Sequence, residues 1–175
     1  MARTKVFTLT NLIILATIFM YIVQTSMQHG TILLGMNIFF LEYDLWYQPL
    51  SSIFAHGGIF HLAMNMFVLY QFGTLLEEQK GKFTFAILYF IGGIVTSLVS
   101  FLFIYSLGLN HNLVGASGAI CVLLGYVALY DRFNRKGILV WVLLISFAPL
   151  LIGMPIAWYA HLIGFAIGWL LGYFI

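Results

Sequence analysis

Charged side chains are nearly absent from this chain, and their scarcity limits what it can fold into more than any other feature. Only 7% of the 175 residues are charged, whereas 63% are hydrophobic and the mean hydropathy is +1.06. Soluble domains carry about 25% charged residues. Because this chain cannot cover its surface with polar groups, we expect an integral membrane protein built as a single domain over residues 1–175.

The apolar residues fall into six segments, each near the ~17–25 residues that an α-helix needs to cross a bilayer. An open sheet is excluded because its edge would leave backbone groups unpaired in lipid, and the alternating segments of a barrel are absent. The first segment follows Arg3 and Lys5, as in a signal peptide, but no clear cleavage site favours its removal. We therefore predict an all-α polytopic membrane protein with six transmembrane helices near residues 7–27, 56–76, 83–107, 115–130, 138–152 and 155–174.

All seven basic residues lie on one side of this predicted bundle: Arg3, Lys5, Lys80, Lys82, Arg132, Arg135 and Lys136. The positive-inside rule makes that side cytoplasmic, together with both termini. The long connection over residues 28–55 then lies outside. Its Trp46 and Tyr47 favour a position in the membrane interface.

Four polar side chains lie within the apolar spans at similar depth. Ser117 is near the outer end of the fourth predicted span, and His161 is about six residues, ~9 Å, into the sixth. His61 and Asn65 lie in the outer part of the second span. We therefore expect these four groups to share one region in the outer half of the bilayer.

Small residues give the fourth and sixth spans a way to approach each other. At four-residue spacing such residues let membrane helices pack closely. Close packing here would bring His161 near Ser117. In the fourth span Cys121 and Gly125 share the face of the serine, Gly118 and Gly125 are the expected contact points, and the sixth span offers Gly164, Gly168 and Gly172.

His61 and Asn65 are spaced i and i+4, so they share one helix face, and both carry hydrogen-bond donors. A serine nucleophile needs such donors to stabilise its oxyanion, and the N–H groups at the start of the fourth span add more. Each residue alone also has a plain explanation. A lone serine is typical of helix packing, His61 and Asn65 are typical of hydrogen bonds between helices, and His161 alone is compatible with a proton relay.

A metal site is not favoured by the sequence. His56 and His61 are five residues apart, unlike the histidines of a His-Glu-x-x-His motif, and no carboxylate accompanies them in a span. Glu77, Glu78 and Asp131 are expected to mark helix ends at the cytoplasmic edge. We expect no metal and no cofactor, and the net charge of +2 does not favour nucleic acid as a partner.

The ordered set of motifs resembles that of the rhomboid intramembrane serine proteases in their minimal six-span bacterial form. Residues 56–65 (HGGIFHLAMN) are similar to the family's second-span signature, and residues 72–77 with Gly81 are similar to the pattern at the end of that span. Residues 115–118 (GASG) resemble its serine motif, and residues 160–168 (AHLIGFAIG) its histidine motif. The resemblance covers nearly the whole chain.

The resemblance implies a serine endopeptidase in a bacterial inner membrane, with an active site that faces outward. Ser117 would be the nucleophile and His161 the general base, without a third acid. Asn65 and His61 would line the oxyanion hole with the backbone N–H of Ser117. Substrates would be membrane-spanning proteins that enter past the fifth span or the outer loop. Supporting residues would be His56, Gly115, Gly118, Cys121, Gly164 and Gly168.

Two positions depart from the family's pattern. Tyr47 follows Trp46 where many members have arginine, which raises the question of what holds the outer loop together. Cys121 stands where many members have a tyrosine that packs on the histidine. We therefore expect His161 to be supported in a different way.

Two other functions stay open at this level. A catalytically silent, rhomboid-like adaptor would be indicated by loss of the serine or the histidine, and both are present. A small transporter or proton pathway through His61, Asn65 and His161 would need polar residues in the inner half and a repeat between the halves, and the sequence shows neither.

Overall fold

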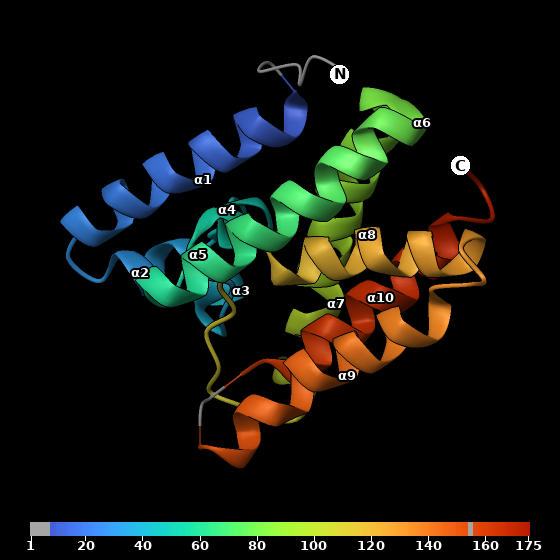
Figure 1. Cartoon of the computed structure of the whole chain (residues 1–175). Helices are drawn as coiled ribbons and strands as arrows, with labels where there is room; N and C mark the ends of the chain where they lie inside the picture. Colours follow the sequence, from blue (N-terminus) through green and yellow to red (C-terminus); the bar gives the residue numbers. More distant parts are fainter. Residues whose placement is uncertain (1–7, 154–155) are drawn as a thin grey trace.

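The computed structural model describes residues 8–153 and 156–175. Arg3, Lys5, Phe7 and Pro155, on which parts of the predicted topology rest, lie outside the described residues. Within them the chain is helical, without β-strands (Figure 1). The helices are α1 Leu9–Ser26, α2 Gly30–Leu34, α3 Phe39–Glu42, α4 Gln48–Phe54, α5 Ile59–Val68, α6 Thr74–Ala86, α7 Gly92–Ser106, α8 Ser117–Tyr130, α9 Arg135–Leu151 and α10 Trp158–Leu171, with π-helical turns at η1 Leu69–Gly73 and η2 Ile87–Ile91.

The all-α class is confirmed: the longer helices fall on the predicted apolar spans, whereas α2, α3 and α4 lie in the stretch predicted as a connection. Leu9–Ser26 and the run Ile59–Ser106 are long and apolar enough to cross a membrane, and Ser117–Tyr130 and Trp158–Leu171 are shorter apolar helices. The run of 48 residues reverses at Gly81, where φ is 84°, a conformation that favours glycine. Figure 1 shows its two arms, one rising to α6 and the other descending through α7. Six membrane crossings stay a prediction.

α8 lies at the centre of the bundle. Nine of its 14 residues are buried, and a helix that is apolar all round belongs in such a position. By contrast, only Ile138, Val142 and Ser146 are buried among the 17 residues of α9. These three are spaced four apart, so α9 has one narrow stripe against the bundle and turns its other faces outward.

α8 and α10 pack against each other more extensively than any other pair of helices. Glycines permit this approach, as the four-residue spacing predicts. A Cβ atom at Gly168 would overlap the carbonyl oxygen of Val122, and one at Gly164 would overlap that of Gly118. A Cβ at Gly125 would overlap the α10 backbone in the same way. The two backbones are therefore in direct contact.

A buried carboxylate joins the start of α1 to α6. Glu77 accepts hydrogen bonds of 2.8 Å from the backbone N–H groups of Leu9 and Thr10 and from the Thr10 hydroxyl. A carboxylate at a helix N-terminus satisfies unpaired donors and favours the positive end of the helix dipole. Glu77 thus marks a helix end, although the end is that of α1 rather than that of its own helix.

The connection over residues 28–55 folds into α2, α3 and α4 and is held by amide side chains. Asn37 Nδ2 donates to the Ile32 carbonyl at 2.7 Å and to Asn112 Oδ1 at 2.9 Å. Gln48 Nε2 donates to the carbonyls of Ile32 and Leu33 at 3.3 and 3.2 Å. These bonds give the connection its internal support, whereas Tyr47 is exposed.

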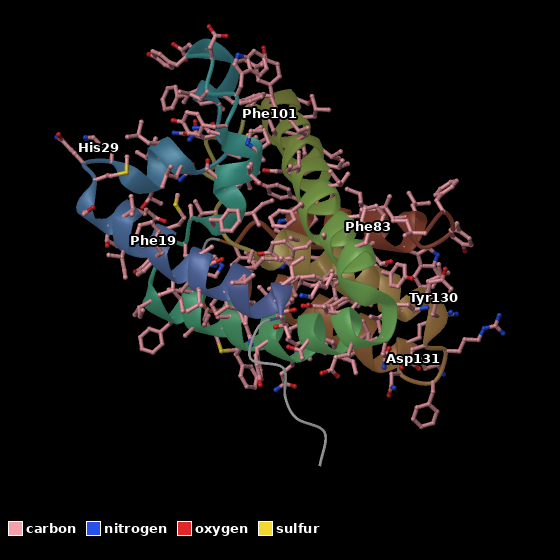
Figure 2. The ribbon with its side chains drawn as sticks, turned by 90° about the horizontal axis from the view of Figure 1, so that it is seen from above. Phe19, His29, Phe83, Phe101, Tyr130 and Asp131 are labelled. Carbon is pink, nitrogen blue, oxygen red and sulfur yellow. The ribbon has the colours of Figure 1, made fainter. Side chains whose placement is uncertain are left out.

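The predicted outer and cytoplasmic connections lie at opposite ends of the molecule. In both figures the α1–α2 turn lies at the left and the α8–α9 turn at the right. Figure 2 labels His29 at the first and Tyr130 and Asp131 at the second.

Hydrogen bonds from the Asn134 side chain and backbone lower the pKa of Asp131 in the α8–α9 turn.

Candidate active site

Ser117 is the first residue of α8, and a turn at Gly115 precedes it. Gly115 has a φ of 122°, and a Cβ there would lie 2.7 Å from the ring of His61. Its N–H donates to the Ser52 carbonyl at 2.9 Å. Gly115 is therefore required both by the backbone conformation and by the closeness of the His61 ring.

The contact between α8 and α10 brings Ser117 and His161 together. His161 lies in the first turn of α10 and is buried. Its Nε2 atom is 2.9 Å from Ser117 Oγ. That distance is within the ~2.6–3.2 Å over which a general base can accept a proton.

The other ring nitrogen of His161 faces a hydroxyl that the sequence reasoning missed. His161 Nδ1 is 3.2 Å from Ser146 Oγ, on the buried stripe of α9. The Ser146 hydroxyl in turn donates to the Val142 carbonyl at 2.6 Å. Only the alignment of Ser146 with Ile138 and Val142 at four-residue spacing marks this serine in the sequence.

Cys121 is fully buried one turn after Ser117. A Cβ at Gly164 would lie 3.3 Å from that of Cys121. This position therefore belongs to the close contact between α8 and α10. The support of His161 comes instead from α9.

Asn65 and His61 lie beside the serine on α5, one turn apart. Asn65 Nδ2 donates to the His61 carbonyl at 2.8 Å. An amide carries two N–H donors, so this bond uses one of them, and Asn65 lines the same cavity as Ser117. The His61 ring accepts at Nδ1 from the Gly57 N–H at 3.4 Å.

His56 supports the turn before Ser117. Its Nε2 atom is 3.4 Å from the Ala116 N–H, and its Nδ1 atom is 3.1 Å from the Phe54 carbonyl. Since a carbonyl only accepts, the ring carries its proton on Nδ1 and accepts at Nε2. Gln24 fixes the His56 backbone through bonds of 2.7 and 2.9 Å to its carbonyl and N–H groups. His56 therefore contacts the loop before Ser117 and not Ser117 itself.

A cavity of about 630 Å³ opens onto these groups. Its wall is mainly apolar with a few convergent polar groups, as is typical of ligand sites. Ser117, His161, His61 and Asn65 all line it, and α5 and α9 form two of its sides through Phe60, Met64, Val68, Trp141, Ile145 and Pro149. Among residues 8–153 and 156–175, no group of three His, Cys, Asp or Glu side chains is placed to hold a metal ion.

Comparison with known proteins identifies the family. Residues 43–175 match the rhomboid domain. The chain is 35% identical over 138 residues to RHOMBOID-like protein 4 of Arabidopsis thaliana, a match that covers 74% of this chain and 34% of that protein. It is 40% identical over 90 residues to the rhomboid protease GluP of Bacillus subtilis (strain 168), a match that covers 50% of this chain and 17% of that protease.

A third relative is the mitochondrial presenilin-associated rhomboid-like protein of Rattus norvegicus, with 36% identity over 78 residues, 45% of this chain and 21% of the relative. The matches thus span about a third or less of each of these three relatives. Because the domain match takes in most of the sequence, the chain belongs to the rhomboid family of integral membrane proteins.

Proposed function

We propose that this chain is a serine endopeptidase that cleaves membrane-spanning proteins by means of a Ser117–His161 dyad. The observation that carries the proposal is the distance of 2.9 Å between Ser117 Oγ and His161 Nε2 at the wall of the cavity. A nucleophile needs a base within hydrogen-bond reach, and this pair meets that requirement.

In the first half of the reaction, Ser117 Oγ attacks the carbonyl carbon of the scissile peptide bond. The hydroxyl proton moves to His161 Nε2, and the carbonyl oxygen becomes an oxyanion. His161 then gives this proton to the leaving nitrogen, the C–N bond breaks and an acyl-enzyme remains. In the second half water attacks the ester, His161 takes its proton and returns it to Ser117, and the product leaves as a carboxylic acid.

Donors for the oxyanion come from two helices. Asn65, through its second amide N–H, and the His61 ring would supply donors from α5, where both residues line the cavity. The start of α8 adds backbone N–H groups without intrahelical acceptors and the positive end of the helix dipole. Donors aimed at the developing charge are worth about 10²–10³ in kcat each.

The proposal includes a topology in a bacterial plasma membrane. The chain would form one domain over residues 1–175 with six spans, a cytoplasmic basic face and an outward active site. The opposite placement of the α1–α2 and α8–α9 turns supports this orientation. Substrate helices would approach between α5 and α9, where apolar side chains line the cavity.

Ser117→Ala provides the test. Purified in detergent and returned to lipid vesicles, the variant should lose cleavage of a transmembrane substrate and labelling by a fluorophosphonate, and keep the melting temperature of the parent chain. His161→Ala should lose both activities as well. Cleavage by Ser117→Ala at the parent rate would refute the proposal, whereas binding of transmembrane segments without cleavage by the parent chain would assign it an adaptor role.

A further inference from the structure

The Ser146 hydroxyl contacts the ring nitrogen of His161 that points away from Ser117. Ser146 is fully buried on the inner stripe of α9, with Oγ 2.6 Å from the Val142 carbonyl and 3.2 Å from His161 Nδ1. A carbonyl only accepts, so the single proton of the hydroxyl lies on the Val142 bond. Toward His161 the same oxygen must therefore accept.

The ring proton follows from this arrangement. An acceptor at Nδ1 requires an N–H there, and neutral imidazole then has its lone pair on Nε2. That lone pair faces Ser117 Oγ at 2.9 Å. The donors form one directed chain, in which Ser117 O–H donates to His161 Nε2, His161 Nδ1–H to Ser146, and Ser146 O–H to the Val142 carbonyl.

We propose that Ser146 is a positioning residue, which holds His161 in the tautomer that can accept the proton of Ser117. The inference rests on the proposed dyad. In triads a carboxylate does this by binding the ring N–H opposite the nucleophile. Here the cavity wall supplies a hydroxyl instead, and a neutral group fits a buried site without the cost of burying a charge.

The same chain of bonds acts during the reaction. When His161 takes the proton of Ser117, the ring becomes a cation and its Nδ1–H becomes a stronger donor. Ser146 can meet it with an oxygen lone pair, because its own proton stays on the Val142 carbonyl. Hydrogen bonds in such a chain polarise one another, which stabilises the imidazolium.

The tautomer is measured by ¹⁵N NMR of histidine-labelled protein in a Ser117→Ala background, where no cleavage occurs. The His161 signals are assigned by their loss in a second variant that also carries His161→Asn. We expect Nδ1 to give the shift of a protonated ring nitrogen and Nε2 that of an unprotonated one. Addition of Ser146→Ala should convert this pattern to a mixture or to the reverse. The reverse pattern with Ser146 present would overturn the proposal.

The second measurement is the cleavage kinetics of single variants that keep Ser117. Ser146→Ala should lower kcat about threefold to tenfold, the loss expected for one neutral hydrogen bond, with KM unchanged. Ser146→Thr keeps the hydroxyl and should retain most of kcat. Thr17→Val is the matched control, since the buried Thr17 hydroxyl also donates to the carbonyl four residues earlier, at Ile13, but on α1.

An unchanged kcat in Ser146→Ala would overturn the positioning role. An equal loss in Thr17→Val would do so too, because it would assign the effect to helix stability. The two proposals fail separately: cleavage by Ser117→Ala removes the dyad, whereas the tautomer pattern is recorded without activity and tests Ser146 by itself.

Discussion

The two ends of α8 differ in the surroundings of their backbone groups. The first turn has N–H groups without intrahelical partners, and the last turn has such carbonyl groups. At the last turn the carbonyls of Ala128 and Leu129 accept bonds of 2.7 Å from the Arg135 guanidinium. The Lys80 ammonium lies 4.7 Å from the ring centre of Tyr130 at that same end. At the first turn, Ser117, Gly118 and Ala119, whose N–H groups have no acceptor within the helix, line the cavity.

This difference separates stability from chemistry along one helix. The negative end of the helix dipole is covered by the chain's own cations. In the proposed reaction, the positive end would face a charge that exists only while a substrate reacts. Changes at the first turn should therefore alter the rate, and changes at the last turn should alter the free energy of unfolding.

Asn65→Ala, on α5 at the cavity that the first turn of α8 also lines, should give the largest effect. Loss of this proposed oxyanion donor should lower kcat about 10²–10³-fold, equivalent to about 2.7–4 kcal/mol of transition-state stabilisation. The measurement is the rate of substrate cleavage in vesicles, with the melting temperature as a check on folding. An unchanged kcat would remove Asn65 from the oxyanion hole.

Gly168→Ala, on α10, tests the packing against the middle of α8. The new methyl group would overlap the Val122 carbonyl, and neither backbone can yield locally, so stability should fall by about 3 kcal/mol and cleavage with it. Gly137→Ala is the matched control on α9, where a Cβ meets no atom within 4 Å. It should be neutral or stabilise by up to about 1 kcal/mol. Equal losses in thermal unfolding would contradict the close-packing argument.

Arg135→Ala gives the smallest effect, at the last turn. Loss of the two bonds to α8 carbonyls should cost about 1 kcal/mol of stability, because the site is partly open to solvent. Arg132→Ala, which removes an equal charge from an exposed neighbour, should cost less. Both variants should keep the kcat of the parent protein. A loss of kcat in Arg135→Ala alone would show that the two ends of α8 are coupled.

Much of the geometry of this site can be predicted from the sequence, because the spacing of small residues predicts which helices pack together. The glycines of α10 predict contact with α8, and that contact brings His161 to Ser117. The approximate positions of the longer helices follow in the same way from runs of apolar residues, whereas α2, α3 and α4 lie in a stretch predicted as a connection. The spacing of glycines and of apolar residues is a local pattern, so it can be read without knowledge of the tertiary structure.

The parts that sequence reasoning missed depend on tertiary contacts. Serines in apolar helices commonly bond to the carbonyl one turn back, and Ser146 does so, which hides its second contact with His161. The bonds that hold the outer connection run between Asn37 and Asn112, 75 residues apart in sequence. Neither pairing has a sequence period that could reveal it.

The narrow buried stripe of α9 links access to chemistry. α9 forms one side of the cavity and buries only Ile138, Val142 and Ser146 against the bundle. If α9 swings outward to admit a substrate helix, Ser146 leaves His161, and the imidazole loses the bond that orients its proton. Under the proposed function, cleavage would then wait until α9 has closed behind the substrate, so that entry and reaction would not occur together.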